Sequence, residues 1–346
     1  MNYEHSEKEC TTEGPNLTNA VLPSARAPRR VVVLGTGAMG RRHVRVLGEM
    51  PSRYVLSGVF DVESGVAEDV ARPWGVPVFH DMDEGIEAAE IVVIASPIHA
   101  HAASAMRALE QGRHVLVEKP MCASVSEASL LLRAAERSGA HLFVGHSERF
   151  NPVIVALKEI VRAREVRAIA LQRAAPIRIQ AGARFREEGV LLSLGVHDVD
   201  LVSHLTESRV ELRGVSGGSN NTNEDRAVLT LVAATGAVAH VVADRLALQR
   251  KRTISIETRD ELFEGDLLVP GLVRRRRGTR GPGIRVELRA AEPLVAQARA
   301  VAAALDGGLP NGVATGWDGT RALSIALEAR QRLRAESASH HVSEAS

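Results

Sequence analysis

The sequence contains little cysteine, few aromatic residues and almost no net charge. Two cysteines among 346 residues are too few for a disulfide framework or a cysteine-built zinc site. Unpaired cysteine is usual in a reducing compartment, so we expect a cytoplasmic protein. The formal net charge is +1, which gives no electrostatic basis for binding nucleic acid or a membrane surface.

Long apolar runs are also absent from the sequence. No run approaches the ~20 apolar residues that a helix needs to cross a bilayer. Residues 1–28 are polar and have no basic segment followed by an apolar one, so we expect a disordered tail rather than a signal peptide. Residues 337–346 are polar too and are expected to form a second disordered tail. The chain between the tails is long enough for two domains.

A short apolar run followed at once by a glycine-rich turn is the clearest motif in the chain. Residues 31–34 are three valines and a leucine, which is typical of a buried parallel strand. Gly35 permits a tight turn, Gly37 leaves room for a pyrophosphate beside the backbone, and Gly40 lets the following helix pack closely. The N-terminus of that helix offers free N–H groups to phosphates. The motif predicts a dinucleotide-binding unit, with a glycine turn in some other α/β unit as the alternative.

Asp61 is the second mark of dinucleotide binding. A strand expected over 54–60 ends at this aspartate, about twenty residues beyond the glycines, where a carboxylate accepts hydrogen bonds from the adenosine ribose. Because a carboxylate repels a 2′-phosphate and Val62 follows it, we expect NAD as the cofactor. Arg41 and Arg42 leave NADP as the alternative.

Strand and helix patterns alternate between residues 29 and 150. The expected strands are 31–34, 54–60, 76–79, 91–95, 114–117 and 141–145, and the expected helices are 38–49, 64–71, 83–88, 99–111 and 124–138. This alternation predicts an α/β fold, with an N-terminal doubly wound parallel sheet of the Rossmann type. Ligands bind outside the carboxyl ends of such strands, where Gly35, Asp61, Ser96, Lys119 and His146 fall.

The pattern changes after residue 151. A helix at 153–163 is followed by period-two strands expected at 166–174, 226–234, 237–247, 252–258, 260–268 and 284–290, with helices at 195–206, 292–306 and 318–336. Turns that contain Gly, Asn and Asp indicate an open, mostly antiparallel sheet. We therefore expect residues 151–336 to form a C-terminal α+β domain, with a substrate cleft between the two domains.

Four further motifs follow the glycine turn. They are Ile94-Ala95-Ser96-Pro97-Ile98-His99-Ala100-His101, Gly112-Arg113-His114-Val115-Leu116-Val117-Glu118-Lys119-Pro120, Val144-Gly145-His146-Ser147-Glu148-Arg149-Phe150-Asn151-Pro152, and Gly195-Val196-His197-Asp198-Val199-Asp200. Together they resemble the Gfo/Idh/MocA family of nicotinamide-dependent sugar and cyclitol oxidoreductases. The resemblance covers residues 31 to about 205. It implies hydride transfer, and a homodimer or homotetramer that assembles through the C-terminal sheet.

Lys119 is the first catalytic candidate. It follows Glu118 at a strand end and precedes a proline, which fixes the backbone. By position alone, a surface lysine paired with Glu118 would be the commoner case. The resemblance implies instead a lysine beside the reacting hydroxyl, where a partly desolvated ammonium lowers the pKa of that hydroxyl.

His197 is the second catalytic candidate. Its apolar neighbours suit a buried structural histidine, whereas the resemblance implies that it removes the hydroxyl proton. The family pattern has an aspartate four residues earlier, where this chain has Ser193, so we expect a less basic histidine. Asp200 lies one helical turn further along and is expected to orient His197 or to bind a substrate hydroxyl.

The remaining site assignments come from the same motifs. Substrate is expected to contact Asp200, Ser193, Arg149 and His146. The cofactor is expected to contact Gly35, Thr36, Gly37, Ala38, Met39, Gly40, Asp61, Ser96, Pro97, His99, His101, Glu118 and Lys119. No metal is expected, because the histidines lack zincin spacing and the resemblance implies hydride transfer without a metal.

A basic run lies near the end of the predicted sheet. It consists of residues 274–277, with Arg280 and Arg285 beyond it. A solvated loop or an edge strand is the ordinary interpretation, because charges on edges prevent sheet aggregation. The alternative is a clamp for the phosphates of a nucleotide-activated sugar. The segment 145–152 also resembles family members that oxidise nucleotide-linked amino sugars at C3.

The sequence therefore predicts an NAD(P)-dependent oxidoreductase. It would move hydride between nicotinamide and a secondary alcohol of a sugar or cyclitol, with amino sugars, aminocyclitols and nucleotide-activated sugars among the candidates. One alternative is a ketosugar or imine reductase that works in the reverse direction. The other is a dinucleotide-bound regulatory protein in which Ser193 has weakened catalysis.

Overall fold

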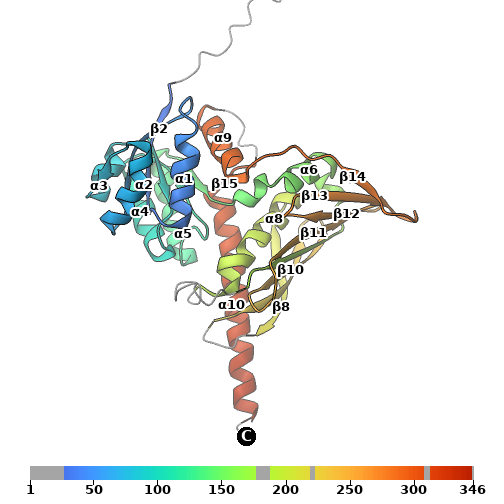
Figure 1. The fold of residues 1–346 in the computed structure, drawn as a ribbon. Coiled ribbons are helices and arrows are strands. Elements are labelled where there is room, and N and C mark those ends of the chain that lie inside the picture. Colours follow the sequence, from blue (N-terminus) through green and yellow to red (C-terminus); the bar gives the residue numbers. More distant parts are fainter. Residues whose placement is uncertain (1–26, 177–187, 219–222, 308–311, 345–346) are drawn as a thin grey trace, which may run out of the picture.

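The computed structural model has two lobes, each built on its own β-sheet (Figure 1). It describes residues 27–176, 188–218, 223–307 and 312–344. The expected N-terminal tail therefore lies almost wholly outside the described residues. Within those residues, no helix combines the length and the apolar character needed to cross a membrane.

The N-terminal lobe contains a seven-stranded sheet in the order β15-β6-β5-β4-β1-β2-β3. Its strands are β1 (Arg29–Leu34), β2 (Tyr54–Phe60), β3 (Val78–Phe79), β4 (Ile91–Ile94), β5 (His114–Val117), β6 (Leu142–Val144) and β15 (Ala314–Thr315). Neighbouring strands are parallel except β15, which runs antiparallel to β6. This is the doubly wound Rossmann sheet that the sequence predicts.

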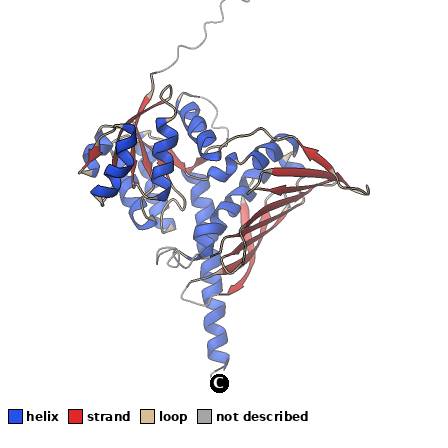
Figure 2. Cartoon of the chain, in the orientation of Figure 1, coloured by secondary structure: helices blue, strands red, loops and turns tan. Residues whose placement is uncertain are grey.

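Helices cover both faces of this sheet (Figures 1 and 2). They include α1 (Ala38–Gly48), α2 (Ser64–Ala71), α3 (Met82–Glu87), α4 (Ile98–Glu110) and α5 (Val125–Ser138). Successive residues of β1 enter opposite cores: Val32 and Leu34 belong to the core of α3, α4 and α5, and Val31 and Val33 to the core of α1 and α2. Burial on both faces explains why the parallel strands are continuous apolar runs.

Two segments from beyond residue 151 return to the N-terminal lobe. Helix α9 (Pro293–Leu305) shares a core with α1 and β1, and the Tyr54 hydroxyl donates a hydrogen bond to the Ala298 carbonyl at 2.6 Å. Strand β15 extends the sheet beside β6. Residue 150 thus marks the point where the chain first leaves the lobe. Local sequence pattern did not show the return, because it does not tell which core an apolar helix face joins.

The C-terminal lobe contains an eight-stranded sheet in the order β14-β13-β12-β11-β7-β10-β9-β8. Its strands are β7 (Ala168–Ala174), β8 (Val210–Gly218), β9 (Arg226–Ala233), β10 (Val238–Asp244), β11 (Lys251–Glu257), β12 (Glu261–Asp266), β13 (Gly271–Arg276) and β14 (Ile284–Val286). Only β7 and β10 pair in parallel among these strands, so the mostly antiparallel sheet is confirmed.

Helices cover one face of the C-terminal sheet and leave the other bare (Figures 1 and 2). They are α6 (Pro152–Ile160), α8 (Val196–Thr206) and α10 (Gly316–Glu344), and the π-helical turn η4 (Leu191–Gly195) leads into α8. Helix α10 continues past residue 336, where the sequence predicted a disordered tail. Residues 337–344 contain no glycine or proline that would stop the helix.

Candidate active site

The glycine turn between β1 and α1 has the geometry of a phosphate cradle. Gly35 has a φ of +91°, and a Cβ there would lie 2.5 Å from the backbone nitrogen of Ser96. A Cβ on Gly40 would lie 1.8 Å from the Gly35 carbonyl oxygen, whereas a Cβ on Gly37 would meet no atom within 4 Å. No side chain caps the N-terminus of α1 at Gly37. The open backbone and the uncapped N–H groups therefore fit a pyrophosphate.

Asp61 lies at the end of β2, next to this turn. Its carboxylate accepts hydrogen bonds from the Thr36 N–H at 2.6 Å, the Thr36 hydroxyl at 2.9 Å and the Glu63 N–H at 3.1 Å. Burial raises the pKa of Asp61, but these hydrogen bonds outweigh that effect and hold the pKa below its usual value. Thr36, which was predicted to contact the cofactor, is fully buried and holds the Asp61 carboxylate through its N–H and its hydroxyl.

The loop after β4 holds the next predicted cofactor residues. Pro97 is the N-cap of α4, and His99 is exposed on the first turn of that helix. His101 is 2% exposed, and its ring nitrogens lie 2.9 Å from the Pro120 carbonyl and 2.8 Å from the Ser96 carbonyl. His101 was predicted to contact the cofactor. Its buried ring ties the loop after β4 to the loop after β5.

Lys119 links the two lobes at the end of β5. Its Nζ donates a hydrogen bond to the Ser193 carbonyl of η4 at 2.8 Å. Burial lowers the pKa of this amine to about 8, and the negative charges of Glu118 and Glu188 act in the opposite direction. A lysine amine with this pKa can both donate and accept a proton near neutral pH.

Glu118 lies behind Lys119 and is 7% exposed. Its Oε1 lies 2.8 Å from Nε2 of His43, a buried residue of α1. Its Oε2 accepts the backbone N–H of Lys119 at 3.3 Å. Glu118 was predicted to contact the cofactor, and its carboxylate contacts His43 of α1 and the backbone of Lys119. His43 was not predicted at all, although it follows the glycine turn by one helical turn.

His197 lies in the first turn of α8, close enough to Lys119 for the charge of that amine to act on its ring. Burial lowers the pKa of His197 well below its usual value, and the positive charges of Lys119, Arg173 and Arg252 lower it further. Its Nδ1 is buried and has no hydrogen-bond partner among the described residues. The His197 ring meets the His146 ring edge-on, with centroids 6.1 Å apart. A neutral imidazole at this position can accept a proton.

The Asp200 carboxylate, expected to orient His197 or to bind a substrate hydroxyl, is paired with Arg149. Arg149 donates two hydrogen bonds to its carboxylate, from Nε at 2.8 Å and from Nη2 at 2.6 Å. Nδ1 of His146 lies 3.7 Å from the same carboxylate. Arg149 is 6% exposed and also approaches Asp318 of α10 at 3.6 Å. Asp200 and Arg149, both predicted to bind substrate, therefore form a buried pair that holds α8 in place.

Ser193, which was predicted to bind substrate, is held by hydrogen bonds within the C-terminal lobe. Its hydroxyl donates to the Gly189 carbonyl at 2.7 Å and accepts a hydrogen bond from Nη2 of Arg245. Only its backbone carbonyl contacts Lys119. A buried arginine thus contacts the position at which the resemblance implies an aspartate.

A buried charge network on the inner face of the C-terminal sheet was not predicted. Arg173 of β7 is 1% exposed and donates to both carboxylate oxygens of Asp198, from Nη2 at 2.7 Å and from Nε at 3.0 and 3.1 Å. Glu148 accepts from Arg252 of β11 at 2.6 Å and from Arg173 at 3.4 Å. The sequence signal for this network was the position of Arg173, which falls on the inward-facing side of a strand with alternating apolar residues. Arg252 keeps 27% of its side chain exposed.

The basic run lies away from the domain junction. Arg274–Arg276 belong to β13, beside the edge strand β14, at the end of the sheet far from the N-terminal lobe (Figure 1). Three of the four arginines of this run are paired with carboxylates: Arg274 with Glu261 at 3.9 Å, Arg275 with Glu264 at 3.0 Å and Arg277 with Glu257 at 2.7 Å. This geometry matches a charged strand near a sheet edge.

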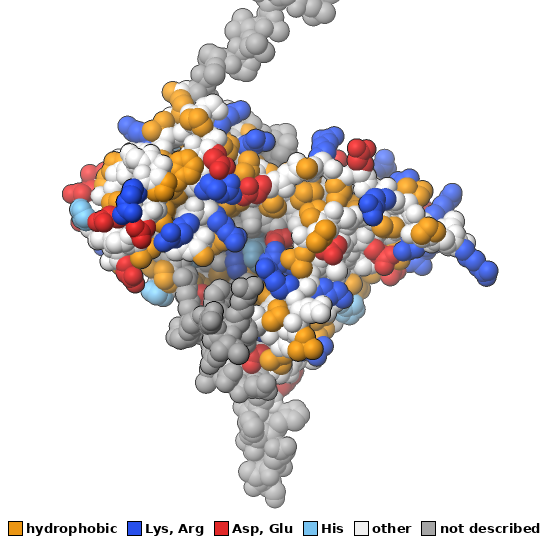
Figure 3. All heavy atoms as spheres, viewed as in Figure 1, with side chains coloured by type: hydrophobic (Ala, Val, Ile, Leu, Met, Phe, Trp, Pro, Cys, Tyr) orange, Lys and Arg blue, Asp and Glu red, His pale blue; other side chains and the backbone are white. Residues whose placement is uncertain are grey.

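The junction between the lobes carries charge of both signs. Figure 3 shows Lys and Arg side chains on both lobes beside the junction, with Asp and Glu side chains among them. Across residues 27–176, 188–218, 223–307 and 312–344, no three His, Cys, Asp or Glu side chains gather in a way that could hold a metal ion.

The chain is similar to known proteins in both lobes. The model of an oxidoreductase family with an NAD-binding Rossmann fold matches residues 29–146, and the model of the GFO/IDH/MocA C-terminal domain matches residues 154–261. UDP-N-acetylglucosamine 3-dehydrogenase of Acidithiobacillus ferrooxidans is 29% identical over 317 residues, which cover 88% of this chain and 97% of that protein. Its solved structure superimposes with a TM-score of 0.81 at 27% identity, covering 89% of this chain and 98% of that one.

A second relative is glucose-6-phosphate 3-dehydrogenase of Bacillus subtilis. It is 31% identical over 216 residues, which span 58% of this chain and 61% of that enzyme. The two family models together cover most of both lobes and contain the glycine turn, Lys119 and His197. The chain therefore belongs to the GFO/IDH/MocA family of oxidoreductases.

Proposed function

We propose that this oxidoreductase transfers hydride between nicotinamide and a secondary alcohol carbon of a sugar or cyclitol. The observation that carries the proposal is the contact between Lys119 and the Ser193 carbonyl, 2.8 Å long. This contact joins the carboxyl end of β5 to the turn that leads into α8, so that Lys119 of one lobe and His197 of the other lie at the same junction. Substrate would bind between them, a usual place for such sites.

Lys119 and His197 would divide the proton chemistry. The Lys119 ammonium donates a hydrogen bond to the substrate oxygen and stabilises the charge that develops there. His197 is neutral, because burial and nearby cations hold its pKa low, so it can accept the hydroxyl proton. In the reverse direction the same two residues would deliver a proton to a ketone oxygen.

NAD fits the residues of the N-terminal lobe. The bound cofactor would supply the nicotinamide ring that accepts or donates hydride. Gly37 leaves its backbone open to the pyrophosphate, and Asp61 is ionised beside it. An ionised carboxylate accepts a hydrogen bond from the ribose 2′-hydroxyl and repels a 2′-phosphate, so we favour NAD over NADP.

For the substrate, an anionic hexose derivative is the class that the junction favours. Arg252 keeps part of its side chain exposed and uses Nη1 for Glu148. Lys119 and Arg173 add positive charge near it. Both relatives named above act on sugars that carry phosphate groups. A phosphate or diphosphate on the substrate would meet Arg252 in the same way.

The first experiment measures reduced-nicotinamide absorbance with NAD and NADP across free sugars, sugar phosphates, nucleotide sugars, cyclitols and aminocyclitols. We expect turnover on one anionic class, abolished by Lys119→Ala and kept by Lys158→Ala. Lys158 pairs with Glu207 away from the junction and controls for the loss of a lysine. Turnover that survives Lys119→Ala would contradict the proposed mechanism.

Arg252→Met tests the substrate class directly. We expect KM to rise at least about tenfold for the phosphorylated sugar, because a charge-assisted hydrogen bond contributes about 1.5–3 kcal/mol. The kcat value and the KM for NAD should change little. An equal rise in KM for a phosphorylated sugar and its unphosphorylated counterpart would show that Arg252 does not recognise the phosphate.

A dinucleotide-bound regulatory protein is the second candidate, favoured by Ser193 in place of the family aspartate. The two candidates differ in their response to Ser193→Asp. A protein that lost catalysis through this serine should gain turnover. In an enzyme adapted to serine, the new carboxylate would pair with Arg245, which already donates to this side chain, and turnover should stay the same or fall.

A further inference from the structure

The Glu118–His43 pair lies behind Lys119, and the proposed chemistry leaves it without a role. His43 is 3% exposed and Glu118 is 7% exposed. The Glu118 carboxyl group lies against the backbone of Gly145, where a Cβ would approach it to 3.0 Å. The Glu118 carboxyl group is therefore buried and closely packed, one residue from Lys119, whose amine takes part in the proposed reaction. Burial of such a charge is costly unless partners stabilise it.

His43 supplies the main stabilising contact. Burial raises the pKa of Glu118, but the hydrogen bond from His43 and the charges of His43, Lys119 and His101 bring it below its usual value. Glu118 is thus ionised, and an ionised carboxylate only accepts hydrogen bonds. Nε2 of His43 must therefore carry a proton in the 2.8 Å contact with Oε1.

A small cavity is lined in part by His43. It has a volume of about 10 Å³, enough for a single water, and is lined by α1, α9 and the sheet. Gln297 of α9 also lines it and is 1% exposed, and neither its Oε1 nor its Nε2 has a hydrogen-bond partner among the described residues. Nε2 of His43 is taken by Glu118, so Nδ1 is the ring nitrogen left to face a water. Gln297 and His43 together offer the polar partners that a buried water needs.

We propose that His43 is a positioning residue for hydride transfer: it keeps Glu118 ionised beside Lys119 and so sets the protonation of the Lys119 amine, with one water between His43 and Gln297 fixing the ring. The proposal rests on the proposed role of Lys119. Other charged or titratable groups also face Lys119: Glu188 before η4, Arg173 of β7, Arg252 of β11, and the rings of His146 and His197. Glu118 is the group among them whose charge depends on a partner in α1.

The test measures the titration of Lys119 itself. The rate at which trace acetic anhydride labels Lys119 is followed against pH by mass spectrometry of the Lys119 peptide, in the protein without substrate. In the unaltered protein the half-labelling pH should be about 8. Glu118→Gln removes the neighbouring charge and should move it down by about one pH unit.

Two variants of His43 form a matched pair. His43→Gln keeps an N–H donor long enough to reach Glu118, and the half-labelling pH should stay near that of the unaltered protein. The side chain in His43→Asn is one methylene shorter than that in His43→Gln, so its N–H donor does not reach Glu118. Glu118 should then become protonated, and the half-labelling pH should fall as it does in Glu118→Gln. Should His43→Asn not fold, His43→Phe fills the ring space without a donor and gives the same test.

Further variants separate the parts of the proposal. His80→Asn, at an exposed histidine of the same lobe, should change nothing. Gln297→Leu should shift the titration in the same direction as His43→Asn but by less, and no shift would remove the water from the proposal. An unchanged titration in His43→Asn, with a lowered one in Glu118→Gln, would overturn the role of His43.

Labelling needs no turnover, so it separates this inference from the proposed function. If Lys119 titrates as expected in every variant but no sugar is oxidised, the role of the Glu118–His43 pair is supported and the proposed function is contradicted. If turnover depends on Lys119 but His43→Asn does not alter the titration of Lys119, the proposed function is supported and the role of the pair is contradicted.

Discussion

At the scale of single residues, Lys119 and His197 predict the pH dependence of the reaction. The His197 pKa lies well below 6.5, so this ring stays neutral from about pH 6.5 upward. Lys119 loses its proton as the pH rises through about 8. We therefore expect kcat/KM for alcohol oxidation to be flat near neutral pH and to fall about tenfold per unit well above pH 8.

Lys119→Arg is the control for this profile, because a guanidinium keeps its proton throughout the accessible pH range. Its remaining activity should lack the alkaline decline. A rate that keeps rising through pH 8 in the unaltered enzyme would show that the neutral amine is the active form, and would contradict the assigned role.

Asp61 predicts the choice of cofactor. Asp61→Ser removes the charge that repels a 2′-phosphate and weakens the contact with Thr36, which now accounts for two hydrogen bonds. We expect the ratio of kcat/KM for NAD to that for NADP to fall by about tenfold or more, since one charge-assisted hydrogen bond contributes about 1.5–3 kcal/mol. Glu63→Gln, which keeps the backbone N–H at this position, should leave the ratio unchanged. An unchanged ratio in Asp61→Ser would remove Asp61 from cofactor selection.

Asp200 shows why the sequence predicted some site residues but not their partners. The spacing of three residues predicts that Asp200 lies one helical turn from His197. Spacing cannot decide between competing partners, however, and Arg149 offers a permanent charge and two donors where His197 offers a neutral ring. The same limit applies to His43, whose partner Glu118 comes from a distant strand. The backbone motifs, in contrast, were predictable because the glycine turn depends only on local geometry.

At the scale of elements, the Arg149–Asp200 pair ties α8 to the short helix η2 (Ser147–Phe150). Arg149→Met leaves Asp200 buried and unpaired, which typically costs about 3–5 kcal/mol of stability. Urea unfolding should show a loss of this size. The double variant Arg149→Met with Asp200→Leu should recover much of it, because no charge is then left without a partner.

Arg162→Met is the matched control for this loss. Arg162 forms an exposed ion pair with Glu165 at 3.9 Å, and such pairs contribute about 0–1 kcal/mol. A double variant as unstable as Arg149→Met alone would show that packing around the arginine, rather than its charge, stabilises α8.

Helices and strands were predictable where burial determines which positions of the sequence are apolar. The parallel strands are apolar on both faces, and β9 to β12 alternate, so both patterns were recognisable. Strand β8 contains Gly214, Gly217 and Gly218, and β13 ends in arginines that resemble a loop. Both strands lie at or next to an end of the sheet, where partners on one side satisfy the backbone and the side chains need not alternate.

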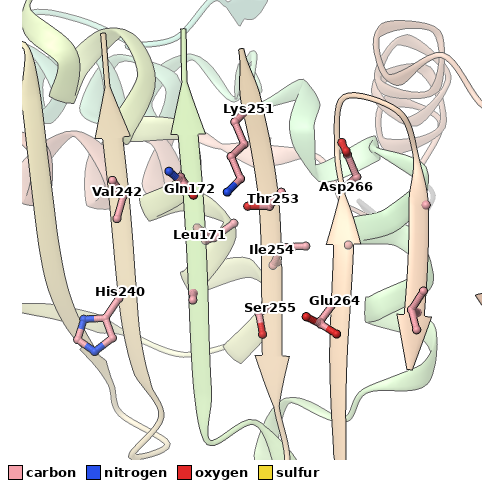
Figure 4. Close-up of a pocket in the computed structure, with 14 residues that line it drawn as sticks. Leu171, Gln172, His240, Val242, Lys251, Thr253, Ile254, Ser255, Glu264 and Asp266 are labelled. Atoms are coloured by element: carbon pink, nitrogen blue, oxygen red, sulfur yellow. The ribbon is translucent and has the colours of Figure 1, made fainter. Parts of the chain in front are cut away.

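At the scale of the whole molecule, the bare face of the C-terminal sheet predicts assembly. This face is hollowed across β7, β10, β11 and β12, and the hollow carries Gln172, Val242, Lys251, Thr253 and Glu264 (Figure 4). The opposite face is covered by helices, so a second copy of the chain is the partner that would bury the bare one, as the family resemblance implies. Sheet-on-sheet packing would place the two faces about 10 Å apart.

Thr253→Arg tests this assembly. Thr253 lies in the middle of the hollow, and a long cation there would meet its own copy, or Lys251 of a second chain, across a closely packed interface. Light scattering after size exclusion should give a multiple of the chain mass for the unaltered protein and a single chain mass for Thr253→Arg. Arg167→Glu, a charge change outside the hollow, should leave the mass unaltered. An unaltered protein that elutes as one chain would show that the bare face stays open, and turnover in that single chain would show that each site is complete within one subunit.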